Sequence, residues 1–366
     1  MKTTPNRLAD IGISQAAADA RIEEAFAAIF TDAKERFYFE TDGDAGYLLD
    51  TGNLDARTEG MSYGMMMAVQ MNRRDLFDRL WRFSKRYMYN GDGPYAGYFA
   101  WSVRPDGMRN SDGPAPDGEE YFAMALFFAS ARWGDGEPPL DYTAQARDIL
   151  HHAVHQQALV PGGHPLWDPE SALIKFVPEL PFSDPSYHLP HFYERFAALA
   201  NREDRVFWSR AALASRAYLA RACHPVTGLA PEYALLDGTP EKESGHGDFY
   251  SDAYRVAMNI GLDCGWFGRS PEYTAIAERL QRFLWKREPF RTYAVDGTEK
   301  DPPALHPTAI IATTAAASLA TDTPLSREWV RLFWETPMRR GNRRYYDNCL
   351  YFFSLLMLAG RYAMLA

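Results

Sequence analysis

Apolar residues recur along most of the chain at spacings of three and four positions, which is the period of an α-helix. No run alternates between apolar and polar residues for long enough to indicate a sheet. Glycine, proline and capping residues divide the helical pattern into segments. The pattern predicts twelve helices, near residues 15–37, 59–72, 74–89, 118–134, 140–157, 188–201, 203–223, 250–265, 270–287, 307–320, 325–336 and 345–364.

The connections between these predicted helices alternate in length. Those that leave the even-numbered helices are short, and those that enter them are mostly long, spanning residues 90–116, 158–187, 224–247 and 288–306. A helical hairpin repeated six times, with one short and one long link per repeat, is what a closed ring of paired helices requires. We therefore predict an all-α fold, an (α/α)6 barrel of six inner and six outer helices, with residues 1–366 as a single domain.

If the even-numbered helices are the inner ones, their N-termini and the long loops all open at one end of the barrel. Acidic, histidine and aromatic residues stand at these helix starts, namely Glu59, Asp117, Tyr187, His188, Asp252, His306, Tyr345 and Tyr346. The long loops add four aromatic residues, Tyr95, Tyr98, Trp101 and Trp167. A large aromatic-lined cleft with a few charged groups is the usual form of a ligand site.

Three of these residues, Glu59, Asp117 and Asp252, are carboxylic acids, and pairs of carboxylic acids cleave glycosidic bonds. One protonates the departing oxygen, and in inverting enzymes a second, about 6.5–9.5 Å away, activates a water molecule. To act as the acid, Glu59 needs a raised pKa, whereas Arg57 and a helix N-terminus would lower it. Burial and repulsion from another carboxylate would have to outweigh both influences.

Each carboxylate also fits a purely structural role. Thr58 is a favourable N-cap, with an acid in the first turn that follows it. Asp117 has capping-box spacing with Glu120. Asp252 could cap a helix or pair with Arg255, and that pairing would lower its pKa and keep it ionised, as a base requires.

The composition narrows the choice of ligand. The chain has 39 basic and 48 acidic residues. The formal charge of −9 disfavours nucleic acid and anionic membranes and suits a neutral or cationic ligand, and sugars are neutral. Its three cysteines are interpreted as buried free thiols of a reducing compartment. The N-terminus has no apolar core of signal-peptide length, and no apolar run reaches the ~18 residues that span a bilayer. We expect a monomer in the cytoplasm that binds neither nucleic acid nor membrane.

The sequence does not predict a cofactor or a metal ion. No glycine-rich phosphate loop follows a strand. His151, His152 and His155 lie on a predicted outer helix, and the pair spaced by four imitates a metal site. Because no glutamate stands between them in the zinc-protease arrangement, we interpret them as a surface cluster.

Two stretches resemble the signatures of a known family. Residues 58–66 (TEGMSYGMM) and 251–256 (SDAYRV) are similar to those of glycoside hydrolase family 8, and the resemblance covers nearly the whole chain. It implies an (α/α)6 barrel and hydrolysis with inversion. By position, Glu59 would be the general acid and Asp252 the general base. Asp117 would hold the sugar at the cleavage point in a distorted ring shape, and Tyr187 would help the base to hold the attacking water.

Within the family, the chain is most similar to members that release xylose from the reducing end of xylo-oligosaccharides. Residues 305–307 (LHP) resemble a corner, including His306, that closes the reducing-end side of the cleft beyond one sugar. Four further positions resemble ligand contacts, namely Arg57, Trp101, Arg255 and Tyr346. The expected substrates are β-1,4-xylo-oligosaccharides of three or more units.

Other functions stay open at this point. An endo-acting xylanase, glucanase or chitosanase of the same family is the first alternative. A sugar isomerase or epimerase can use the same barrel, with histidines as acid and base. A sugar-binding protein without catalysis is a third class.

Overall fold

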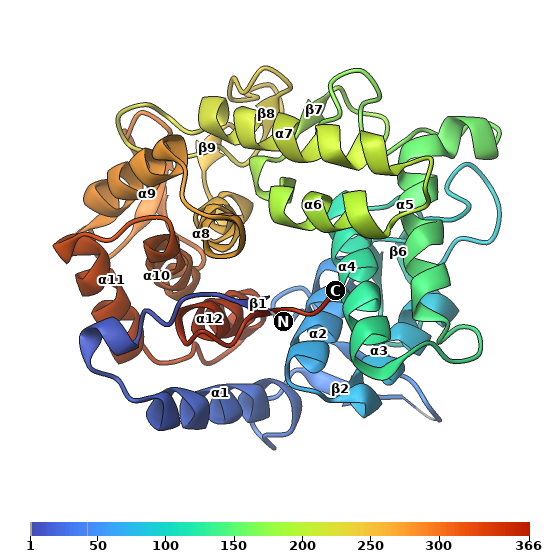
Figure 1. The fold of residues 1–366 in the computed structure, drawn as a ribbon, viewed down its shortest axis with the longest axis horizontal. Helices are drawn as coiled ribbons and strands as arrows, with labels where there is room; N and C mark the ends of the chain where they lie inside the picture. The colour runs from blue at the N-terminus through green and yellow to red at the C-terminus, as the bar shows by residue number, and fades with distance from the viewer. Residues whose placement is uncertain (1, 42) are drawn as a thin grey trace.

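The computed structural model describes residues 2–41 and 43–366, and in this part of the chain twelve α-helices form a double ring (Figure 1). This is the (α/α)6 barrel predicted from the helix and loop spacing. The helices are α1 (Gln15–Phe30), α2 (Thr58–Gln70), α3 (Arg74–Phe83), α4 (Pro116–Trp133), α5 (Tyr142–Leu159), α6 (Pro190–Leu199), α7 (Arg205–Ala222), α8 (Arg255–Phe267), α9 (Pro271–Leu284), α10 (Pro307–Ala316), α11 (Pro324–Glu335) and α12 (Arg344–Leu358).

The even-numbered helices form the inner ring, as predicted. Each of them contacts the next even-numbered helix, and α12 contacts α2, which closes the ring. Helices α2, α4 and α12 are buried on nearly all sides, whereas the outer α3 and α7 bury only one face. Small residues bring the inner helices together: a Cβ at Gly118 of α4 would collide with the side chain of Thr58 of α2.

Short strands accompany the helices and are not predicted from the sequence. They are β1 (Lys2–Thr3), β2 (Tyr38–Glu40), β3 (Gly46–Leu48), β4 (Ala56–Arg57), β5 (Ser102–Val103), β6 (Arg109–Ser111), β7 (Phe182–Ser183), β8 (Ala234–Leu235), β9 (Asp248–Phe249), β10 (Arg291–Ala294), β11 (Glu299–Pro303) and β12 (Ala363–Met364). Strands of two to five residues are too short to show a period of two.

The strands pair antiparallel in five small sheets, β1–β12, β2–β3, β4–β5–β6, β7–β8 and β9–β10–β11. Apart from β1–β12, every strand lies in a segment that precedes an inner helix. The sheets therefore brace the long loops at the barrel end where the inner helices begin. In the sheet β4–β5–β6, Arg57 pairs with Ser102 and so stands beside Trp101.

Several predicted helix boundaries are wrong. The helix predicted over 74–89 ends as an α-helix at Phe83 and continues as a π-helical turn over Ser84–Met88. The first helix ends at Phe30, because the Asp32 side chain accepts the backbone N–H groups of Lys34 and Glu35 and turns the chain. The helix predicted over 250–265 begins as a short 3-10 turn, η4 (Ser251–Tyr254), before α8.

The last helix ends at Leu358 rather than at 364. The chain turns at Gly360, whose φ of +68° favours glycine, and then enters β12. Strand β12 pairs with β1, so the two ends of the chain lie together, as Figure 1 shows.

The three cysteines, Cys223, Cys264 and Cys349, are buried and unpaired, as predicted. Among the described residues, the structure contains no helix with the length and apolar character needed to cross a membrane.

Candidate active site

A buried arginine at the start of α8 joins three carboxylates from different helices. Arg255 donates from Nη1 to Oδ2 of Asp117 at 2.7 Å, and the same nitrogen lies 3.4 Å from Oε2 of Glu59. Its Nη2 lies 3.3 Å from Oδ2 of Asp252. Because one planar guanidinium spans the gap, these Glu59 and Asp252 oxygens stand at most about 9 Å apart. The predicted convergence of these acids at one end of the barrel is confirmed.

Glu59 meets the requirement for a general acid. Burial raises its pKa to about 8, and the charges of Asp117 and Asp252 act in the same direction. Arg255 and Arg57 lower the pKa but do not offset burial. The carboxyl group is therefore protonated at neutral pH, and this proton is available to a leaving group.

A tyrosine that the sequence analysis placed at the mouth, without a role, holds this carboxyl group. The Tyr345 hydroxyl donates a hydrogen bond to Oε1 of Glu59 at 2.9 Å. A Cβ at Gly60 would collide with that hydroxyl, so the glycine after the acid keeps the space that Tyr345 needs. The only sequence signal for Tyr345 is its place at an inner helix start, beside Tyr346.

The capping interpretations of Thr58 and Asp117 are wrong. Helix α2 begins at Thr58, whose side chain caps nothing, and α4 begins at Pro116 with Ala115 as its N-cap. The Asp117 side chain turns to Arg255 instead, and burial raises its pKa. Glu120, the other half of the expected capping box, accepts a hydrogen bond from the Tyr193 hydroxyl at 2.9 Å.

Asp252 lies in the turn η4, directly after a strained residue. Ser251 has a φ of +36°, which non-glycine residues seldom adopt. Strain of this kind persists where the surrounding structure enforces it, and it is common at active sites. The Asp252 side chain remains about one quarter exposed, so water reaches it.

Tyr187 ends the 3-10 turn η3 (Pro185–Tyr187) and lines the same cavity wall as Asp117 and Asp252. Burial raises its pKa well above the usual range, and the neighbouring carboxylates add to the shift. Its hydroxyl therefore keeps its proton and can donate a hydrogen bond to a ligand in the cavity that Asp252 also lines.

Two cavities of unequal size meet at the acids. The larger measures about 430 Å³ and is lined by Arg57, Thr58, Glu59, Trp101, Pro114, Ala115, Asp117, Phe176, Val177, Tyr187, Tyr233 and Asp252. The smaller measures about 110 Å³ and is lined by Asp50, Asn53, Arg57, Glu59, Ser251, Asp252, Leu305, His306, Arg343, Tyr345 and Tyr346. Arg57, Glu59 and Asp252 belong to both, so the boundary between the cavities runs through the proposed acid and base.

His306 forms a braced wall of the smaller cavity. Its Nδ1 lies 2.8 Å from Oδ2 of Asp347, and Arg339 donates to the same oxygen at 2.6 Å. Arg339 also donates to the backbone carbonyl of Leu305 at 2.6 Å. Asp347 and Arg339 were not predicted as site residues, because they contact the corner rather than the substrate side of the cavity.

Aromatic faces line the larger cavity. The guanidinium of Arg57 stacks on Trp101 at 5.2 Å from the ring centre, and the rings of Phe176 and Tyr233 lie 4.1 Å apart. Neither Phe176 nor Tyr233 was predicted, because isolated aromatics in long loops carry no periodic signal.

Three other predicted loop aromatics do not line this cavity. Tyr98 is buried, and its hydroxyl donates to the backbone carbonyls of His152 and His164. Trp167 packs in the core against Tyr193 and Trp208. Tyr95 lies beside Gly113 and is not among the residues that line the cavity.

Two predicted site residues remain, Tyr346 and Arg255. Tyr346 lines the smaller cavity, where its hydroxyl donates to the backbone carbonyl of Ser251 at 3.3 Å. Arg255, predicted as a ligand contact, is instead 2% exposed and lies behind the carboxylates, outside both sets of lining residues.

A fourth acid, Asp184, is fully buried 3.9 Å from Arg255, and burial raises its pKa well above the usual range.

Two histidines, one just before the inner helix α6 and one in its first turn, are ordinary core residues. His188 lies within hydrogen-bond distance of the hydroxyls of Ser183 and Ser215, and burial lowers its pKa to about 3. Burial also lowers the pKa of His191 well below its usual value. Both are therefore neutral, and neither lines the two cavities.

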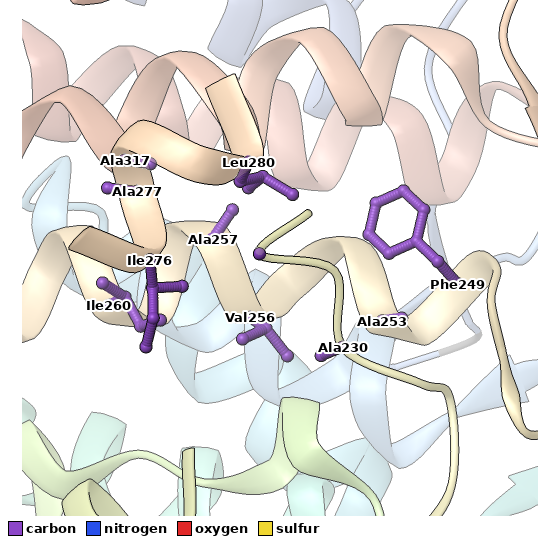
Figure 2. A pocket seen from close by; sticks show the side chains of 11 residues that line it. Ala230, Phe249, Ala253, Val256, Ala257, Ile260, Ile276, Ala277, Leu280 and Ala317 are labelled. Atoms are coloured by element: carbon purple, nitrogen blue, oxygen red, sulfur yellow. The ribbon is translucent and has the colours of Figure 1, made fainter. Parts of the chain in front are cut away.

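A further hollow lies between α8 and α9 and is entirely apolar (Figure 2). It measures about 10 Å³, barely the room of one water molecule, and offers no polar side chain. It is a packing defect rather than a ligand site. The side chains around it come from Ala230, Phe249, Ala253, Val256, Ala257, Ile260, Ile276, Ala277, Leu280 and Ala317.

Comparisons with known proteins agree with this geometry. Residues 24–360 match the model of the glycosyl hydrolases family 8. A reducing end xylose-releasing exo-oligoxylanase of Halalkalibacterium halodurans is 57% identical over 98% of this chain and 93% of its own length. A second one, from Paenibacillus barcinonensis, is 57% identical over 94% of this chain and 92% of its own length.

A solved structure extends the likeness to three dimensions. It is a crystal structure of a mutant reducing-end-xylose releasing exo-oligoxylanase complexed with xylobiose, 55% identical, with a TM-score of 0.98 over 100% of this chain and 98% of that chain. The barrel, the convergent acids and the family match lead to one conclusion: the chain belongs to glycosyl hydrolases family 8.

Proposed function

We propose that the protein hydrolyses β-1,4-xylo-oligosaccharides of three or more units and releases xylose from their reducing end. The proposal rests on one observation. Glu59 and Asp252 lie where a large cavity of about 430 Å³ meets a small one of about 110 Å³. Several sugars fit on one side of the cleavage point, and the other side is closed by His306. The relatives that share more than half of their residues with this chain are named for the same reaction.

The residues divide the chemistry between them. Glu59 transfers its proton to the glycosidic oxygen as the bond to the anomeric carbon breaks. Asp252 removes a proton from a water molecule, which attacks the anomeric carbon from the opposite face. The product then has inverted configuration, and Glu59 recovers its proton while Asp252 gives one up to solvent.

The neighbouring residues position the reactants. The Tyr187 hydroxyl donates a hydrogen bond to the attacking water beside Asp252. Asp117, held by Arg255, binds the sugar whose bond is cleaved and favours its distorted ring shape. Trp101 and the Phe176–Tyr233 pair offer flat faces to the sugars on the larger side.

The proposal also covers the oligomeric state and the cellular location of the enzyme. A monomer in the cytoplasm would trim oligosaccharides that a cell imports, since intact polymer does not enter. The net charge of −9 supports a partner other than nucleic acid or an anionic membrane. Size-exclusion chromatography with light scattering tests the monomer: a mass near 41.5 kDa is expected, and a dimer overturns it.

The direct test is proton NMR of the products from linear xylotriose, with cellotriose as the comparison. We expect xylose and xylobiose, with the newly formed reducing end of xylobiose appearing first as the α-anomer, and slow or no cleavage of cellotriose. Faster cleavage of cellotriose would favour the glucanase alternative. Conversion of free xylose would indicate an isomerase, and tight binding without release of xylose would indicate a binding protein.

Substitution tests the two central roles. Glu59→Ala and Asp252→Ala should each lower xylotriose turnover by several orders of magnitude, because each removes one of the two proton transfers. Circular dichroism and thermal melting check that the barrel remains folded. Turnover near that of the wild type in either folded variant would refute the assignment.

A further inference from the structure

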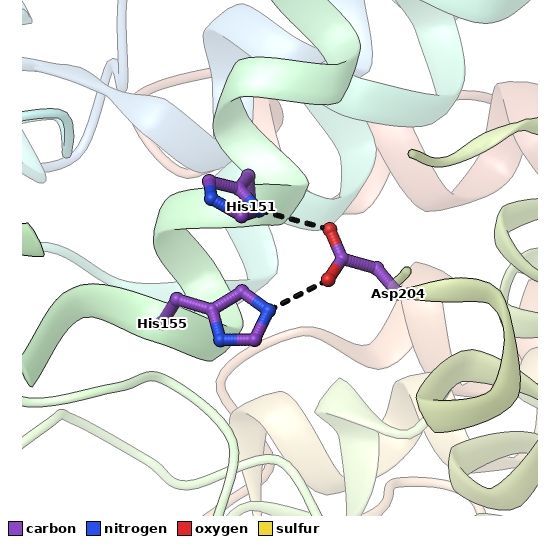
Figure 3. Close-up of side chains that lie close together, drawn as sticks. All are labelled: His151, His155 and Asp204. Carbon is purple, nitrogen blue, oxygen red and sulfur yellow. Dashed lines mark hydrogen bonds and ion pairs between the residues drawn. The ribbon is translucent and has the colours of Figure 1, made fainter. Parts of the chain in front are cut away.

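Three side chains converge on the outside of the barrel, away from the substrate cleft. His151 and His155 lie on one face of α5, four residues apart, and Asp204 precedes the first residue of α7. His151 Nδ1 lies 3.0 Å from one oxygen of the Asp204 carboxylate, and His155 Nε2 lies 2.6 Å from the other. Figure 3 shows both rings facing this carboxylate.

Asp204 occupies the N-cap position of α7, but its side chain does not cap the helix. Aspartate at an N-cap normally accepts a backbone N–H of its own helix, but Asp204 makes no such bond to α7. The residue is only 1% exposed, and within the described part of the chain no lysine or arginine forms an ion pair with it. A buried carboxylate needs a partner for its charge, and the imidazoles of His151 and His155 are the titratable partners that lie beside Asp204.

The arrangement matches a first-row divalent cation. Two imidazole nitrogens and a carboxylate oxygen are ligands that zinc accepts, at bond lengths of about 2.0–2.2 Å. Tetrahedral bonds of that length place ligand atoms roughly 3.3 Å apart. The three ligand atoms already lie within 4.8 Å of one another, so small side-chain rotations close the site. The half-exposed histidines leave room for water as the fourth ligand.

We propose that His151, His155 and Asp204 bind one zinc ion, which fastens outer helix α5 to the start of α7. The sequence favoured a surface cluster because no glutamate stands between the histidines in the zinc-protease arrangement. The third ligand, Asp204, is 49 residues from His155, and only the fold brings it close. The bound ion compensates the charge of Asp204 and stabilises the folded chain, since the unfolded chain does not assemble the three ligands. The site shares no residue with the two cavities, so the ion takes no part in the hydrolysis.

The test measures zinc binding to the purified full chain after removal of metal with a chelator. Equilibrium dialysis against zinc chloride, followed by elemental analysis, should give one zinc per chain. His151→Gln and His155→Gln should each weaken binding by at least tenfold, and both positions are surface-accessible, so the variants are expected to fold. His164→Gln, at an exposed loop histidine, is the matched control and should bind zinc like the wild type.

Thermal melting gives a second readout that is independent of activity. Zinc should raise the melting temperature of the wild type and of His164→Gln, but not that of His155→Gln. The proposal is overturned if no stoichiometric zinc binds, in which case the cluster is only a hydrogen-bonded clamp. It is also overturned if His155→Gln retains binding and the melting shift. Xylotriose turnover should be the same with and without zinc. A negative result for zinc binding therefore does not affect the proposed hydrolysis.

Discussion

The carboxyl group of Glu59 stands between opposing electrostatic influences. Burial and the charges of Asp117 and Asp252 favour its protonated form, while Arg255 and Arg57 favour the ionised form. Burial prevails and raises the pKa to about 8. Activity should therefore decline as the pH rises through about 8, because the proton needed by the leaving group is lost.

The raised pKa of Glu59 also predicts a pH-dependent stability. The folded protein holds a proton here at pH values where the unfolded chain, with a pKa near 4.5, has released it. The resulting stabilisation is full below about pH 4.5 and is lost as the pH rises toward 8. Glu59→Gln, which carries no charge at any pH, should gain a few degrees in melting temperature relative to the wild type between pH 5 and pH 8. Melting curves at both pH values check this, and a constant difference would contradict it.

Tyr345 is predicted to position the acid. Its hydrogen bond favours the ionised form of Glu59, so Tyr345→Phe should raise the pKa of Glu59 and move the basic limb of the kcat profile upward by about one unit. Loss of the fixed orientation should lower kcat about tenfold. Tyr346→Phe is the matched control, because its hydroxyl donates to the Ser251 carbonyl rather than to the acid. An unshifted limb in Tyr345→Phe, or an equal shift in the control, would refute the role.

At the level of single residues, the sequence was sufficient to identify the three acids but not the side chains that contact them. Glu59, Asp117 and Asp252 were identified because charged residues at the starts of apolar helices are conspicuous. Their pKa values and the contacts of Tyr345 and Asp184 depend on side chains far apart in the sequence, such as Arg255 and Glu59. The capping interpretation of Asp117 was a reasonable local prediction, and a tertiary contact overrode it.

At the scale of elements, the long loops and their small sheets shape the cleft. The segment before α10 brings His306 against the smaller cavity, and α12 supplies Asp347 and Tyr346 to hold it. His306→Ala should enlarge this cavity beyond one sugar. Xylohexaose labelled at its reducing end should then yield labelled xylobiose in addition to labelled xylose. Labelled xylose as the sole first product would show that His306 does not set the selectivity.

Helices were easier to predict than strands for a physical reason. A helix of ten or more residues repeats its apolar spacing several times, whereas β4 and β5 have two residues each and depend on pairing with distant segments. For the same reason the aromatic wall of Phe176 and Tyr233 was missed. Helix ends were misplaced where a local turn, such as the one at Asp32, ends a pattern that otherwise continues.

At the scale of the whole molecule, the ring brings residues nearly two hundred positions apart to one guanidinium. Alternating short and long connections were sufficient to predict the barrel and the end at which the site lies, because parallel inner helices place all their N-termini together. The division of the cleft into a large and a small cavity was implied only by the family resemblance of residues 305–307. The proposal that residues 1–366 act as a single domain stays a prediction.

The central claim is that this unequal cleft directs cleavage to the last bond before the reducing end. The most direct measurement follows the wild-type protein acting on xylohexaose labelled at its reducing-end sugar, with products separated at early times. We expect labelled xylose and unlabelled xylopentaose as the first products. Labelled xylobiose or longer labelled fragments at the same early times, or unlabelled xylose before any labelled xylose, would contradict it.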